Sequence, residues 1–96
     1  MAEYMFLMHD DAEADANAWQ PYIGELQRRG CFEGGSAMGD GICVRKSGES
    51  SAITAHLAGY IRVNAENLEQ AKSLLAGNPL FEAGGTVEIR ELPRTE

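Results

Sequence analysis

The hydrophobic pattern of the first third of the chain predicts a strand followed by a helix. Residues 4–8 are bulky and apolar without polar alternation, which indicates a strand covered on both faces. Apolar residues at i, i+3, i+4 and i+7 then predict an amphipathic helix between about Asn17 and Arg29; they are Trp19, Tyr22, Ile23 and Leu26. Because proline is tolerated only in the first turn, Pro21 places the start of this helix near Ala18.

The glycine-rich middle of the chain predicts an added hairpin. Residues 31–37 and 41–46 have the apolar anchors of two short strands, with residues 39–41 as the joint. Residues 48–51 are then the predicted tip of a second turn, and the chain returns through residues 52–55.

The second half of the chain repeats the order of strand, helix and strand. A strand is predicted from Ala58 to Val63, and a helix begins after Asn64 as its N-cap. Its apolar stripe consists of Leu68, Ala71, Leu74 and Leu75. Gly77 to Pro79 ends this helix, and alternating residues from Thr86 to Leu92 predict the last strand. The order β-α-β-β-α-β predicts one α+β domain over residues 1–96, a two-layer sandwich with both helices on one face of the sheet.

The other face of this sheet has no cover within the chain. Val87 and Ile89 are predicted to face the helices, so the alternate residues of the same strands face the opposite way. These are Tyr60, Arg62, Glu88 and Arg90, and apolar residues of the first strand lie beside them. A mixed apolar and charged sheet face is rarely left in water, so we expect a homodimer that uses this face.

Three segments of the second half resemble a known family. They are Gly59 to Val63 (GYIRV), Asn78-Pro79 and Glu82 to Glu91 (EAGGTVEIRE). Together they are similar to the C-terminal half of the YCII-related (DGPF-type) family. The resemblance implies a ferredoxin-like fold and assembly as a dimeric α/β barrel. Where many members carry Asp-Gly-Pro-Phe, this chain has residues 52–56 (AITAH), so the acid of that motif is missing. The first helix also lacks the histidine that another branch pairs with an aspartate.

Composition narrows the classes of partner. The net charge of −7 argues against nucleic acid, which requires a basic face. No apolar run approaches the roughly 20 residues that span a bilayer, and no signal peptide is evident. Cys31 and Cys43 have no C-x-x-C spacing, so reduced cysteines in a cytoplasmic protein are expected, both buried as small hydrophobes.

Two motifs suggest ligand chemistry and also have simpler interpretations. Residues 34–41 invite comparison with a phosphate-binding loop, but no Lys-Ser/Thr follows, which favours turn and bulge glycines. His9, Asp10 and Asp11 suggest a metal, but adjacent strand residues point to opposite faces and do not converge on one ion. We therefore predict neither a metal nor a cofactor.

The remaining polar residues form the candidate site. Arg45, Arg62 and Arg90 are predicted to converge on the open sheet face and bind a small anion, with Tyr60 and Glu88 beside them. The alternative is a ladder of cross-strand ion pairs. His56, just before the third core strand, is a candidate for proton transfer or a simple surface residue. Trp19 and Tyr22 are core or pocket-wall residues in either case.

Two functions of different classes are compatible with these residues. The first is a non-catalytic small-ligand-binding or accessory module, which the missing family acid favours. The second is an enzyme that acts on a small organic acid, of isomerase or lyase type, in the pocket of the barrel.

Overall fold

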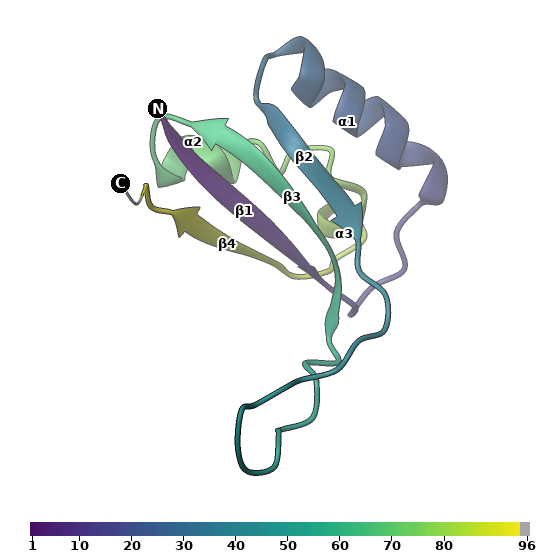
Figure 1. Ribbon diagram of the computed structural model, residues 1–96. Coiled ribbons are helices and arrows are strands. Elements are labelled where there is room, and N and C mark those ends of the chain that lie inside the picture. The colour runs from purple at the N-terminus through teal and green to yellow at the C-terminus, as the bar shows by residue number, and fades with distance from the viewer. Residues whose placement is uncertain (95–96) are drawn as a thin grey trace.

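Four antiparallel strands form one sheet in the computed structural model, which describes residues 1–94 (Figure 1). Residues 95–96 of the predicted domain lie outside this description. The strands are β1 (Ala2–His9), β2 (Phe32–Ala37), β3 (Leu57–Ala65) and β4 (Val87–Leu92). Their order in the sheet is β2-β3-β1-β4. This order and the α+β class confirm the predicted arrangement, which is compatible with a ferredoxin-like fold.

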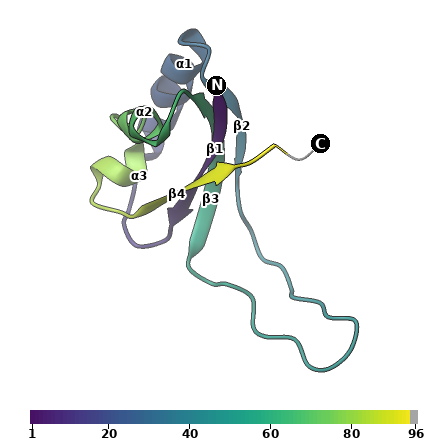
Figure 2. The ribbon, with the colours of Figure 1, turned by 90° about the vertical axis from the view of Figure 1, so that its left-hand side faces the viewer.

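All helices lie on one face of the sheet (Figure 2). They are the 3-10 turn η1 (Ala16–Ala18), α1 (Trp19–Arg28), α2 (Leu68–Ser73) and α3 (Pro79–Glu82). The start of α1 after Ala18 agrees with the prediction from Pro21. Gly30 follows α1 with a φ of +74°, which is the left-handed conformation that glycine adopts readily.

The core lies between the helices and the even-numbered residues of β1. Tyr4, Phe6 and Met8 are buried, whereas Met5 and Leu7 on the other face are only half-buried. From β3, Ile61, Val63 and Ala65 join the core, and the helices supply Tyr22, Leu26, Ala71, Leu74, Leu75 and Leu80. The apolar run in β1 is therefore covered on the helix side but not on the opposite face of this chain.

The predicted start of the second helix is wrong by three residues. Asn64 remains in β3, because β3 pairs with β1 as far as Ala65 opposite Ala2. Asn67 caps α2 instead, and its side-chain oxygen accepts a hydrogen bond from the backbone N–H of Gln70 at 2.9 Å. Leu68, predicted to lie on the buried stripe, is exposed.

A short helix that the sequence analysis missed connects α2 to β4. The buried side chain of Asn78 accepts hydrogen bonds from the backbone N–H groups of Leu80 and Phe81, both at 3.0 Å, and so caps α3. Gly84 then turns the chain with a φ of +92°. Gly85 has no room for a side chain, since a Cβ there would lie 2.6 Å from Cγ of Leu80.

The predicted central hairpin is absent as a pair of strands. Residues 38–56, here called the arm, project from the sheet and have no strand assignment (Figures 1 and 2). The predicted strand at 31–37 is present as β2, whereas that at 41–46 is not. An isolated two-stranded hairpin is marginal in water, and no third element of the described chain covers this one.

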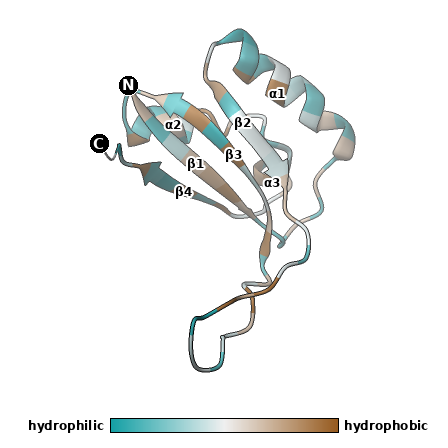
Figure 3. Ribbon diagram, viewed as in Figure 1, coloured by the Kyte–Doolittle hydropathy of each residue, from teal (hydrophilic) through white to brown (hydrophobic). Residues whose placement is uncertain are grey.

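The arm carries exposed apolar side chains on both of its limbs (Figure 3). Ile42 is 84% exposed and Val44 is 78% exposed, and Met38 and Ile53 are also exposed. Cys43 is exposed as well, so its predicted burial is wrong, and Cys31 is half-buried. No helix among residues 1–94 is long and apolar enough to cross a membrane.

Candidate functional site

The face of the sheet opposite the helices, here called the open face, carries most of the predicted site residues. Strand register sets them in rows that run across the sheet. In one row Arg62 of β3 and Arg90 of β4 both lie opposite Met5 of the central β1. In the next row Tyr60 and Glu88 both lie opposite Leu7. In both rows, an apolar residue of the central β1 is therefore flanked by polar residues of β3 and β4.

Arg62 and Arg90 are each paired with a carboxylate. Nε of Arg62 donates a hydrogen bond to Oε1 of Glu3 at 2.8 Å, and this bond raises the pKa of Arg62. Nε of Arg90 donates to Oε2 of Glu88 at 2.7 Å. The bonds from Arg90, and secondarily from His9, hold the pKa of Glu88 below its ordinary value. Of these two ion pairs, Arg62–Glu3 joins β3 to β1, as in the cross-strand ladder that is the alternative to an anion site, whereas Arg90–Glu88 lies within β4.

Two histidines meet at one end of the open face. Nε2 of His9 lies 3.2 Å from Oε1 of Glu88, and the ring of His56 stands edge-on to that of His9 with centroids 4.8 Å apart. His56 lies directly before β3, where the sequence placed it. The structure therefore joins His56 to the Glu88–Arg90 pair through His9, a residue that the sequence analysis had considered only as a metal ligand.

Arg45 is not brought together with the other arginines. It lies in the arm, where its Nη1 donates a hydrogen bond to the backbone carbonyl of Glu49 at 3.1 Å. The arm extends away from the sheet (Figure 2), so Arg45 does not join Arg62 and Arg90. These two share the open face but lie on either side of β1, each with its own carboxylate.

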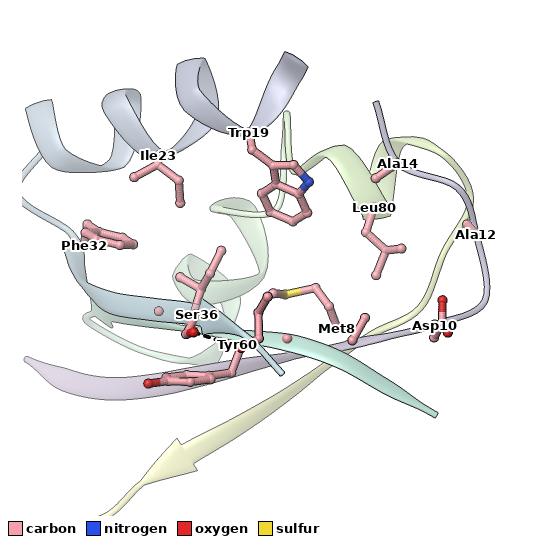
Figure 4. A pocket seen from close by; sticks show the side chains of 15 residues that line it. Met8, Asp10, Ala12, Ala14, Trp19, Ile23, Phe32, Ser36, Tyr60 and Leu80 are labelled. Atoms are coloured by element: carbon pink, nitrogen blue, oxygen red, sulfur yellow. Dashed lines mark hydrogen bonds between the residues drawn. The ribbon is translucent and has the colours of Figure 1, made fainter. Parts of the chain in front are cut away.

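A cavity lies on the other side of the sheet, beneath α1, and is here called the α1 pocket. Its volume is about 570 Å³, within the range of small-molecule sites. Trp19 and Ile23 project from α1 over the sheet, and Phe32, Met8 and Leu80 complete the apolar walls (Figure 4). The other lining residues are Asp10, Ala12, Ala14, Gly35, Ser36, Ala37, Ala58, Gly59, Tyr60 and Ile61.

Small residues of β2 and β3 make the floor of the α1 pocket. A Cβ at Gly35 would lie 2.6 Å from the carbonyl oxygen of Tyr60, and a Cβ at Gly59 would lie 2.9 Å from that of Ser36. The two strands approach too closely at these glycines for a side chain there. The apolar side chains of Ile61 and Met8 lie beside them, with Cγ1 of Ile61 3.1 Å from the added Cβ of Gly35 and Cε of Met8 3.6 Å from that of Gly59. Ser36 and Tyr60 line this part of the sheet, but their register places their side chains on the open face (Figure 4).

Asp10 is the one charged residue in the lining of the α1 pocket, as far as residues 1–94 describe it. Its backbone N–H donates to the carbonyl of His56 at 2.7 Å. The next residue is also anchored, because Oδ1 of Asp11 accepts a hydrogen bond from the backbone N–H of Thr86 at 2.9 Å. The Thr86 side chain and, secondarily, this backbone bond lower the pKa of Asp11. The loop therefore holds Asp10 at one end of the pocket, away from Phe32 and Ile23 at the other (Figure 4).

The sequence analysis named Trp19 as a possible pocket wall but missed the pocket. The sequence feature that indicates the pocket is the combination of large residues on one face of α1 with small residues in the facing strands, such as Gly35 and Gly59. That combination becomes visible only when the register of β2 and β3 is known.

Comparison with known proteins assigns the chain to no family. The chain matches no known family model, and no curated protein is significantly similar to it. Within residues 1–94, no group of three or more His, Cys, Asp or Glu side chains is arranged to hold a metal ion.

Proposed function

We propose that this chain is a non-catalytic small-ligand-binding module whose ligand lies in the α1 pocket. The observation that carries the proposal is the pocket itself, about 570 Å³ of space with apolar walls and a floor of small and apolar residues. Its lining within the described chain contains no histidine, cysteine or lysine, so it offers a surface for binding rather than a nucleophile with its base.

A thermal-shift screen with small aromatic and alicyclic compounds tests this proposal. A ligand that binds only the folded state raises the unfolding midpoint. The control is Ala37→Leu, because Ala37 pairs with Gly59 on the helix side and lines the pocket. The added side chain fills part of the cavity and is expected to abolish the shift. Arg62→Met, on the open face, should leave the shift unchanged. A shift that persists in Ala37→Leu would place the ligand elsewhere.

We also propose that the module works as a homodimer through the open face and the arm. Met5 and Leu7 remain half-buried on the open face, and the arm of the same chain exposes Ile42 and Val44. A second copy can cover both surfaces at once. The sheet order β2-β3-β1-β4 is compatible with a ferredoxin-like fold, and the YCII-related family that the sequence resembles uses that fold in dimeric α/β barrels.

A second candidate function rests on the histidines of the open face. A histidine held by a carboxylate is the usual arrangement of a general base, and His9 lies 3.2 Å from Glu88. An enzyme acting on a small organic acid would use this end of the face, with Arg62 or Arg90 as the carboxylate donor. Turnover of a small organic acid that is lost in His9→Gln, but kept in Ala37→Leu, would favour this function over the binding module.

A further inference from the structure

We infer that the α1 pocket takes a flat, apolar molecule that carries one cationic amine, with the ring over the floor of the pocket and the ammonium group at Asp10. This inference rests on the proposed binding function of the pocket and adds the chemical class of its ligand. It differs from the anionic ligand expected on the open face, which remains a separate prediction.

The shape of the α1 pocket favours a flat ligand. The floor is made of Gly35 and Gly59, which have no room for a Cβ, with the apolar side chains of Ile61 and Met8 against them. Aromatic walls stand at the sides, with the indole of Trp19 suspended from α1 and the ring of Phe32 at the edge of β2 (Figure 4). An aromatic ring that lies against the indole and these apolar side chains buries its faces, and stacked or edge-to-face contacts with Trp19 or Phe32 add to the burial.

The pocket is chemically different at its two ends. Ile23 and Phe32 lie at one end, whereas Asp10 lies at the other with Ala12 beside it (Figure 4). Because the Asp10 side chain is exposed at the mouth, an ammonium group placed there can keep part of its hydration while it meets the carboxylate. A ligand with one apolar and one cationic end therefore matches the pocket along its length.

Charges around the pocket mouth favour a cation over an anion. Residues 1–27 contain no lysine or arginine, and the loop beside the pocket carries Asp10, Asp11, Glu13 and Asp15. The arginines of the sheet, Arg62 and Arg90, are paired with carboxylates on the opposite face. His9 faces Glu88 on that side as well, with His56 against it. An anion in the pocket would meet Asp10 with no described cation in the lining to offset it.

Three probes of nearly equal size separate the ligand class from binding itself. They are phenylpropylamine, phenylpropanol and phenylpropionate, titrated against the full chain. Trp19 is the only tryptophan of the protein and lines the pocket, so its fluorescence reports binding directly. The amine is expected to bind about two- to five-fold more tightly than the alcohol, the range of an exposed ion pair, and the carboxylate most weakly. About 1 M salt should shrink this difference.

A matched pair of variants tests the role of Asp10. Asp10→Asn removes the charge at the mouth and should make the amine and the alcohol bind equally. Glu13→Gln removes the same charge from the same loop at an exposed residue outside the lining, so it should leave most of the preference. Equal loss of preference in both variants would overturn the assignment to Asp10.

The outcomes distinguish the inference from the proposed function. If all three probes bind equally, or the carboxylate binds best, and Ala37→Leu blocks them, the pocket binds small molecules but the inferred class is wrong. If none binds, or Ala37→Leu changes nothing while circular dichroism shows it folded, the proposed binding function fails and the inference with it.

Discussion

Among single residues, Tyr22 shows most clearly how one polar atom ties the helix layer together. Its hydroxyl donates a hydrogen bond to the carbonyl of Leu74 at 2.8 Å, between α1 and the end of α2. Burial of the side chain raises the pKa of Tyr22 to about 12, and the neighbouring Asn78 opposes this shift only in part. Both features favour the protonated phenol, because burial disfavours the charged phenolate and only the phenol can donate to Leu74.

Tyr22→Phe is therefore expected to lower the free energy of unfolding by about 1 kcal/mol near neutral pH, the contribution of one hydrogen bond. Because the folded-state pKa is raised, the stability linked to Tyr22 is complete below its ordinary value of 10.0 and is lost as the pH rises to about 12. Urea unfolding across this range checks the prediction. Tyr60→Phe, on the open face, is the control, and an equal alkaline loss of stability in Tyr22→Phe and the wild type would contradict it.

Among the elements, α2 depends on a cap three residues later than its pattern predicts. Asn67→Ala removes the side chain that accepts from Gln70 and should cost about 1 kcal/mol of unfolding free energy. Asn64→Ala is the matched control, since Asn64 lies in β3 and its side chain bonds only to exposed Glu33. Chemical denaturation of both variants measures the difference. A larger loss in Asn64→Ala would contradict the observed boundary.

The helices and strands that could be predicted from the sequence are those in which one face points inward, because that face sets the spacing of apolar residues within the segment. The stripe beginning at Trp19 and the alternation around Val87 met this condition, and α1 and β4 lie close to where they were expected. The end of β3 could not be predicted, because it depends on pairing of Ala65 with Ala2, a contact across 63 positions (65 minus 2). The short α3 was missed since Asn78 and Pro79 also suit the simple end of a helix.

The candidate site was predictable only in part for the same reason. Alternation along one strand places Arg62 and Arg90 on the open face, as expected. It does not reveal that Glu3 pairs with Arg62, or that His9 reaches Glu88. The α1 pocket could not be predicted, because it forms where α1 packs over two strands, and the pattern within one segment does not show how segments pack.

In the whole molecule, the arm is the feature that a single chain explains least well. Its two limbs touch where a Cβ at Gly41 would lie 3.1 Å from Cδ1 of Ile53, yet the apolar side chains of Ile42 and Val44 point into solvent. Removal of exposed apolar groups of this kind from water is favourable, so a partner that covers them binds with a gain in stability. A second copy is the partner that we propose, because it would also cover the open face.

Ile42→Ser combined with Val44→Ser is expected to convert a homodimer into a monomer. Light scattering at micromolar concentration should give twice the chain mass of 10.4 kDa for the wild type. Burial of each side chain contributes roughly 1.5–3 kcal/mol, and a symmetric dimer buries two copies of each, so the double variant should dissociate at least about ten-thousandfold more readily.

Ser51→Ala lies in the same arm and removes no apolar surface, so it serves as the control and should remain dimeric. The far-ultraviolet circular dichroism of the double variant should match the wild type, because the arm contributes no helix or strand to the fold. A wild type that is monomeric would refute the dimer itself. A double variant that stays dimeric would instead confine the interface to the open face, with Met5 and Leu7 as the residues to replace next.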